Sequence, residues 1–207
     1  MRIVCISDTH EVHQKIVMPE GDLLIVAGDF TFKGCPNHIT IFNDWLGTLD
    51  YKHKVTIAGN HDLLFEDDAL QARLLLTNAT YLEDSSVTIE GIKIYGSPWT
   101  PRFFDWAFNA NRGPIIAAKW AAIPDDTNVL VTHGPPFGIL DLTPKGLHVG
   151  CDDLLIRIDQ LKQLKLHAFG HIHHSYGLAH RNGVAFANAC ICNEAYIAAR
   201  DPIVVDI

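Results

Sequence analysis

The stretch that decides how the chain folds is Ile3-Val4-Cys5-Ile6-Ser7-Asp8-Thr9-His10. Its first four residues are apolar and mostly β-branched, which is typical of a short strand buried on both faces. The strand stops at a small polar residue, and Asp8 and His10 follow directly. In an extended segment, residues two apart project to the same side, so both side chains are expected to face one region.

Four more segments repeat this pattern of a short apolar run that ends in Asp, Asn or His. They are residues 23–27 before Gly28-Asp29, 55–58 before Gly59-Asn60-His61-Asp62, 129–132 before His133, and 167–169 before Gly170-His171-Ile172-His173. In open α/β sheets, sites form just outside the carboxyl ends of the strands. The five strand ends are therefore predicted to build one site.

The segments between these strands predict the rest of the fold. Apolar residues recur near the helix period in residues 39–49, 67–76, 114–123 and 152–164. Hairpins are predicted around Glu90-Gly91 and Asn182-Gly183, and a last strand at 203–205. About nine strands are too many for one simple crossover sheet, so we expect an α/β (α+β) architecture of two packed mixed β-sheets flanked by helices. Neither a repeat nor a linker divides residues 1–207, which predicts a single domain.

The composition argues against several classes of protein. The 24 acidic residues outnumber the 16 scattered basic ones and give a net charge of −8, so a long nucleic acid is not an expected partner. No apolar run approaches the roughly 20 residues that cross a bilayer, and no signal-peptide pattern follows Met1, so no membrane is expected. Five irregularly spaced cysteines without C-x-x-C predict neither a disulfide framework nor a thiolate zinc site. A cytoplasmic protein fits best.

The side chains at the strand ends are imidazoles, carboxylates and one amide. This donor set suits Mn, Fe or Zn rather than a closed structural zinc site. Two metals roughly 3.5–4 Å apart can activate a water between them and clamp the oxygens of an in-line displacement at phosphorus. Such a pair needs a bridging carboxylate, and Asp29 is the natural candidate.

The ordered motifs Asp8-x-His10, Gly28-Asp29, Gly59-Asn60-His61-Asp62, His133 and Gly170-His171-x-His173 resemble the calcineurin-like metallophosphoesterase superfamily. The resemblance implies a four-layer αββα fold and two divalent transition-metal ions, with Mn expected first and Fe, Zn or Ni as alternatives. It implies one metal held by Asp8, His10, Asp29 and His173, and a second held by Asp29, Asn60, His133 and His171. His61 would be the catalytic histidine that binds no metal, and Asp62 would fix the orientation of its ring.

Further motifs, among them Tyr95-Gly96-Ser97-Pro98-Trp99 and Thr132-His133-Gly134-Pro135-Pro136, are similar to the metallophosphoesterase-domain-containing subgroup. That similarity implies a phosphodiesterase acting on small substrates, with cyclic nucleotides as the leading candidates. A hydroxide bridging the two metals would attack phosphorus while His61 assists the leaving group. Ser/Thr protein phosphatases follow their Gly-Asp with x-V-D-R-G, whereas Phe30-Thr31-Phe32-Lys33-Gly34 stands here, which argues against a phosphoprotein substrate.

Weaker signals leave alternatives open. The aromatic-rich segment 98–112 is interpreted either as a loop packed on the sheet or as a wall that stacks a base, and the candidate substrate-binding residues are Trp99, Asn109, Arg112 and His148. His174 is expected behind the ligands or facing solvent. A phosphomonoesterase, and a metal-binding scaffold or regulatory protein with little turnover, are the alternative functions. The expected partner is a small phosphoester or nucleotide, and the oligomeric state is open between a monomer and a homodimer.

Overall fold

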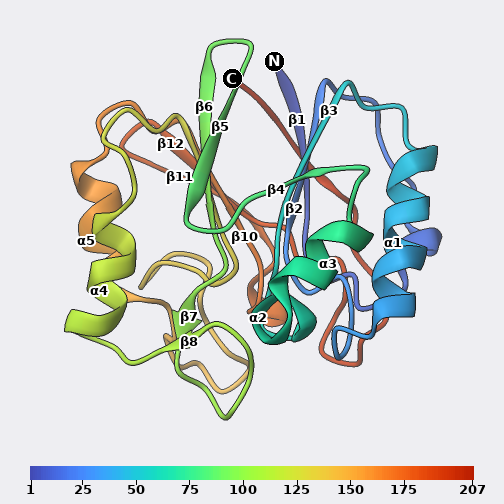
Figure 1. Cartoon of the computed structure of the whole chain (residues 1–207). Helices are drawn as coiled ribbons and strands as arrows, with labels where there is room; N and C mark the ends of the chain where they lie inside the picture. The colour runs from blue at the N-terminus through green and yellow to red at the C-terminus, as the bar shows by residue number, and fades with distance from the viewer.

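The computed structural model describes residues 1–207 and contains two β-sheets packed face to face (Figure 1). The first sheet has the order β13-β1-β2-β3-β4, in which β1 to β4 run parallel and β13 pairs antiparallel with β1. Its strands are β1 (Arg2–Ile6), β2 (Leu23–Ala27), β3 (His53–Ile57), β4 (Thr80–Tyr81) and β13 (Ile203–Asp206). The strands predicted before Asp8, Asp29 and Asn60 are thus parallel neighbours.

The second sheet has the order β11-β12-β10-β9-β6-β5. Its four central strands are parallel, and β5 and β11 close the two edges as antiparallel partners. The strands are β5 (Ser85–Ile89), β6 (Ile92–Ser97), β9 (Val129–Thr132), β10 (Leu166–Phe169), β11 (Gly177–Arg181) and β12 (Val184–Asn188). Both predicted hairpins, β5–β6 and β11–β12, are therefore confirmed.

Helices cover the outer face of each sheet, so that four layers result (Figure 1). The first sheet carries α1 (Pro36–Thr48), α2 (Leu64–Asp67) and α3 (Ala69–Leu75), and the second carries α4 (Pro114–Ala121) and α5 (Asp152–Gln160). Apolar side chains such as Ile25 and Val131 fill the space between the sheets, while Phe42 and Trp120 pack under the helices. The four-layer αββα prediction is confirmed. No helix has the length and apolar character that crossing a membrane requires.

The boundaries differ from the predicted ones for local reasons. The helix expected at 67–76 is two short helices, because Asp68 leaves helical conformation at φ −144° and caps α3 by accepting a 3.0 Å bond from the Gln71 amide. Helix α5 ends at Gln160, although Leu161 and Leu164 stay buried beyond it. Three two-residue strands, β4, β7 (Thr100–Pro101) and β8 (Asn109–Ala110), bring the strand count to 13, and they were not predicted because strands this short leave no sequence pattern.

Candidate metal centre

The carboxylate of Asp29 lies between histidines that belong to the two sides of the predicted site. Its Oδ2 atom is 3.2 Å from Nε2 of His133 and 4.0 Å from Nε2 of His10. Its Oδ1 atom accepts a 2.8 Å hydrogen bond from the backbone amide of His61. One carboxylate thus reaches both predicted ligand groups, which is the geometry that a bridging ligand requires.

The first ligand group gathers around Asp8. Nε2 of His173 lies 3.2 Å from Oδ1 of Asp8 and 3.3 Å from Nε2 of His10, and His10 Nε2 is 3.9 Å from the same carboxylate oxygen. The structure therefore brings together the four residues predicted for one metal, although they come from loops after β1, β2 and β10.

The second ligand group gathers around His133. Its Nε2 atom is 2.9 Å from Oδ1 of Asn60, and single donor atoms of Asp29, His133 and His171 all lie within 4.8 Å of one another. The rings of His133 and His171 meet edge to face with centroids 5.0 Å apart. These four residues are the set predicted for the second metal.

The hydrogen bonding of the ligand histidines fits divalent cations. Nδ1 of His133 donates to the carbonyl of Ala27 at 2.8 Å, and Nδ1 of His173 donates to the carbonyl of Asn193 at 3.0 Å. In the neutral rings, the Nε2 lone pair of His133 then faces the oxygens of Asp29 and Asn60, and that of His173 faces an oxygen of Asp8. Each of these pairs consists of two hydrogen-bond acceptors, which repel each other. A cation bound by both resolves that conflict, and the backbone carbonyls fix the tautomer for it.

Protonation is the other way to relieve the same conflict, and the pKa values reflect it. Burial opposes a charge on His133, but the carboxylate of Asp29 outweighs it and raises the pKa of His133 to about 9. Burial likewise opposes ionisation of Asp29, yet His133 and His10 lower the pKa of Asp29 to about 2. The site is therefore built to hold negative carboxylates beside a positive charge.

The backbone at the ligands is turned rather than extended. Asp8, His10, Asp29 and His171 have φ of 52°, 38°, 53° and 69°, and η2 (His173–Ser175) begins at the next ligand. The side chains of Asp8 and His10 do converge, as do those of His171 and His173. The reason predicted for this, an extended backbone, is wrong. Side chains converge because left-handed turns redirect them, a conformation that is uncommon for residues other than glycine and clusters at functional sites.

Two glycines of the motifs leave room for the carboxylates. A Cβ atom on Gly59 would lie 2.2 Å from Oδ1 of Asp29, and one on Gly170 would lie 2.0 Å from Oδ2 of Asp8. Any side chain at either position would displace the carboxylate. The glycines that precede Asn60 and His171 in the sequence are therefore steric requirements of the site.

His61 lies beside the ligand groups and at the wall of the cavity. One of its ring nitrogens is within 4.8 Å of donor atoms of His10 and Asp29. Nδ1 donates to the carbonyl of Phe32 at 2.9 Å, and the ring packs on Trp106 with centroids 4.2 Å apart. Nε2 makes no hydrogen bond to the protein and is left for a ligand.

The predicted contact between Asp62 and the ring of His61 does not form. The buried carboxylate of Asp62 accepts hydrogen bonds of 2.8 to 2.9 Å from the amides of Asp29, Gly59 and Thr31 and from the Thr31 hydroxyl. Burial and the charge of Asp29 raise its pKa to about 7. The carbonyl of Phe32 orients the His61 ring instead, and Asp62 fixes the backbone that carries the ligands.

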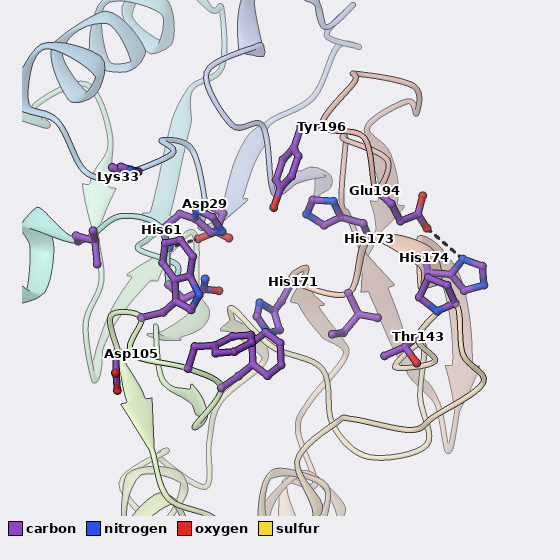
Figure 2. A pocket seen from close by; sticks show the side chains of 17 residues that line it. Asp29, Lys33, His61, Asp105, Thr143, His171, His173, His174, Glu194 and Tyr196 are labelled. Carbon is purple, nitrogen blue, oxygen red and sulfur yellow. Dashed lines mark hydrogen bonds and ion pairs between the residues drawn. The ribbon is translucent and has the colours of Figure 1, made fainter.

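A cavity of about 890 Å³ opens over the ligands (Figure 2). Aromatic side chains form much of its wall, and an ion pair of His174 with Glu194 at 3.1 Å lies at its rim. His174 is thus a cavity residue that is partly open to solvent. The aromatic lining residues are Phe103, Phe104, Trp106 and Tyr196.

Three of the four predicted substrate-binding residues are engaged elsewhere. The indole of Trp99 donates to Asp84 at 2.9 Å and lies under the ammonium group of Lys119. Arg112 donates to backbone carbonyls of the loop before α5, and His148 pairs with Asp141 at 2.6 Å. None of them lines the cavity, because each satisfies a local loop contact. The assignment to substrate binding is corrected for all three.

Asn109, the fourth, supports the cavity wall without lining it. Its side chain accepts from the amide of Phe103 and donates to the carbonyls of Phe103 and Phe104, and so holds that aromatic turn. Trp106 belongs to the same aromatic-rich segment, for which the sequence left open a loop packed on the sheet or a wall that stacks a base. No local pattern marks Tyr196, which sequence reasoning missed.

Comparisons with known proteins agree with this geometry. Residues 1–175 match the model of the calcineurin-like phosphoesterase family. The chain is 43% identical to metallophosphoesterase domain-containing protein 1 of Homo sapiens over 230 residues, covering 100% of this chain and 71% of that protein. It is 39% identical to UPF0046 protein T07D4.2 of Caenorhabditis elegans, covering 100% of this chain and 60% of that protein.

The fold is also found among solved structures. The crystal structure of TT1561 from Thermus thermophilus superimposes with a TM-score of 0.60, over 90% of this chain and 88% of that one, at 12% identity. Together, the family match and the two ligand groups identify a metal-dependent phosphoesterase. The chain belongs to the calcineurin-like phosphoesterase family and, within it, to the metallophosphoesterase-domain-containing subgroup.

Proposed function

We propose that the protein hydrolyses small phosphodiesters at a centre of two divalent metal ions, with cyclic nucleotides as the leading candidate substrates. The observation that carries the proposal is the position of Asp29, which reaches both ligand groups at the base of a cavity that also exposes His61. Bound there, the two ions would polarise the phosphoryl oxygens and lower the pKa of water. Mn is the first expectation, and Fe, Zn and Ni are the alternatives.

His61 would supply the proton that the leaving group needs. Its Nδ1 hydrogen is committed to the carbonyl of Phe32, so a second proton on Nε2 makes the ring cationic. As the P–O bond breaks, Nε2 gives that proton to the departing oxygen and the ring becomes neutral. Packing on Trp106 and the bond to Phe32 hold the ring while it does so, and positioned general acids of this kind contribute roughly 10²–10⁴-fold.

The character of the cavity favours a diester over a monoester. Lys33 is the one Lys or Arg residue among those that line the cavity, and it is exposed. A phosphomonoester dianion is usually bound by several cationic or bidentate donors. A diester carries one charge and organic groups on both sides, which suits aromatic walls such as Trp106 and Phe103. Bases stack on aromatic rings with about 1–3 kcal/mol each, and this supports nucleotides as substrates.

The cellular setting is part of the proposal. All five cysteines are free thiols, and four of them are buried. Unpaired buried thiols are typical of proteins that work in a reducing compartment, which supports the cytoplasm.

The experiment is a substrate screen on protein stripped of metal and reloaded separately with Mn, Fe, Zn or Ni. The substrates are 2′,3′- and 3′,5′-cyclic nucleotides, acyclic phosphodiesters and phosphomonoesters. We expect metal-dependent turnover of diesters, with kcat/KM above that for the matched monoester. Equal or better turnover of monoesters would favour the phosphomonoesterase, and binding of nucleotides without turnover in any metal form would favour the scaffold.

A further inference from the structure

The turn after Cys192 places one tyrosine over the metal ligands. Asn193 organises this turn: its side-chain oxygen accepts from the amides of Ala195 and Ile197, and its own amide donates to the carbonyl of Ile197. Its carbonyl accepts from the amide of Tyr196 at 2.9 Å and from Nδ1 of the ligand His173 at 3.0 Å. One backbone carbonyl therefore fixes both a predicted metal ligand and Tyr196.

Tyr196 is held in a conformation that a bulky residue rarely adopts. Its φ is 58°, in the left-handed region that disfavours side chains with a Cβ atom. The hydrogen bonds of the Asn193 turn maintain it. Strain of this kind is kept where the surrounding structure determines the position of a side chain, and it is common at functional sites.

The ring of Tyr196 sits at the junction of the first ligand group and His61. It packs edge-on against His10 with centroids 4.8 Å apart, against His173 at 5.6 Å and against His61 at 6.4 Å. Figure 2 shows its hydroxyl directed inward, toward the space between Asp29 and His173. The hydroxyl thus points into the space between the predicted metal ligands and His61 (Figure 2), where the proposed reaction would place the phosphoryl group.

The hydroxyl of Tyr196 makes no hydrogen bond within the protein. The hydroxyls of Tyr51, Tyr81 and Tyr176 each donate to an oxygen of the protein, whereas those of Tyr95 and Tyr196 make no such hydrogen bond, and of these two only Tyr196 lines the cavity. The residue is 42% exposed and lines the cavity. A strained residue that presents an unpaired donor to a cavity offers that donor to a ligand bound there.

We propose that the Tyr196 hydroxyl donates a hydrogen bond to a non-bridging oxygen of the phosphoryl group bound at the centre. This inference rests on the proposed phosphoesterase function and adds a substrate-contacting residue to it. During in-line displacement, negative charge stays on the non-bridging oxygens, and a fixed neutral donor stabilises it without adding to the cations already in the site. Lys33, the one Lys or Arg residue that lines the cavity, is exposed and makes no contact that would fix its position.

The test compares Tyr196→Phe, which removes only the hydroxyl, with Tyr81→Phe, which removes a hydroxyl that donates to Glu83 and does not line the cavity. In Tyr196→Phe, we expect kcat/KM for a phosphodiester to fall about 10- to 100-fold, the range that loss of a hydrogen bond to a charged group produces. The Kd of inorganic phosphate for the metal-loaded protein, measured by calorimetry, should rise about 10-fold. Metal content should stay unchanged in both variants, and Tyr81→Phe should match the wild type.

Three outcomes would overturn the assignment. The first is a Tyr196→Phe variant with wild-type kcat/KM and phosphate Kd. The second is loss of bound metal in that variant, which would place its role in the ligand shell. The third is a Tyr196→Ala variant that fails while Tyr196→Phe does not, which would assign the role to the ring. If the wild type hydrolyses no phosphodiester, the proposed function fails, and the phosphate Kd still decides the hydroxyl contact.

Discussion

The backbone amide of His171 donates a 2.9 Å hydrogen bond to Oδ2 of Asp8, although the two residues follow strands of different sheets. The thiol of Cys190 donates to the same oxygen at 3.1 Å. With Oδ2 occupied, Oδ1 is left facing Nε2 of His173 at 3.2 Å. The loops after β10 and β12 thus fix the orientation of the Asp8 carboxylate independently of a cation, which is how hydrogen-bonded partners prepare a metal ligand.

Gly170→Ala should disrupt this arrangement. The new Cβ would lie 2.0 Å from Oδ2 of Asp8 and 2.1 Å from the hydroxyl oxygen of Ser7, so the carboxylate has to turn or the loop has to move. Loss of a partner that orients a metal ligand typically weakens metal binding about 10- to 100-fold. We expect a loss of metal affinity of this size, measured by competition with a chromogenic chelator.

Gly91→Ala is the matched control for that experiment. Gly91 has φ +82° in the turn of the β5–β6 hairpin, and a Cβ there meets no atom within 4 Å. It should lower stability by about 1 kcal/mol through its left-handed backbone and leave metal affinity intact. Equal metal affinity in Gly170→Ala and the wild type would contradict the role given to the His171–Asp8 bond.

The grouping of the candidate ligands at one edge of the sheets was predictable from sequence because their signals are local. A parallel strand buried on both faces is a short apolar run, and a site at its carboxyl end begins within two residues of that run. Asp29 and His133 therefore stand at the ends of β2 and β9 as expected. The order of layers followed from the number of such runs and from the apolar stripes of α1 and α5.

What the sequence did not reveal depends on contacts between distant segments. The orientation of His61 comes from the carbonyl of Phe32, and every residue has such a carbonyl, so no residue type marks it. Asp62 follows His61 in sequence, yet it turns toward the amides of Asp29 and Thr31 from another loop. Tyr196 reaches the site because the loop after β12 pairs with the loop after β1 through a bridge between Cys190 and Ser7, and no local pattern encodes that pairing.

His61→Ala should lower kcat while metal content stays the same. His61 is not one of the predicted metal ligands, so its removal should not release the metal. Its removal takes away the proton donor, and we expect kcat to fall about 10²–10⁴-fold. The loss should be smallest for p-nitrophenyl esters, whose leaving group departs without protonation, and larger for alkyl esters. Steady-state kinetics on both ester types checks this. A uniform loss across leaving groups, or a loss of metal, would contradict the role of acid.

Asp62→Asn should affect the ligand loops rather than the proton transfer. In the variant, an amide nitrogen replaces one of the two carboxylate oxygens. In one orientation this nitrogen faces the backbone amides of Asp29 and Gly59, and in the other it faces the amide and hydroxyl of Thr31, so buried donors are left unpaired in either case. Because the residue is fully buried, the expected cost is about 3 kcal/mol in the free energy of unfolding. Urea denaturation measures this, and metal content should fall with it. If the variant instead reproduces the kinetic pattern of His61→Ala with full stability, Asp62 acts through His61 after all.

His13→Phe should make the protein less sensitive to acid. The ring of His13 is buried against Phe42 and Trp45, neither of its nitrogens has a hydrogen-bond partner, and burial lowers its pKa to about 4 despite the nearby charge of Glu11. The unfolded chain takes up this proton near pH 6.5, so stability is lost as the pH falls from about 6.5 toward 4.

The size of this effect follows from the two pKa values of His13. At pH 5 the unfolded histidine is almost fully protonated and the folded one is not, which costs about 2 kcal/mol relative to pH 7.5. Phenylalanine fills the same space and does not titrate, so urea unfolding of His13→Phe should show a smaller drop between these pH values by that amount. His167, whose pKa burial lowers to about 3, keeps some acid sensitivity in both proteins. Parallel pH profiles of the wild type and the variant would show that His13 is protonated in the fold.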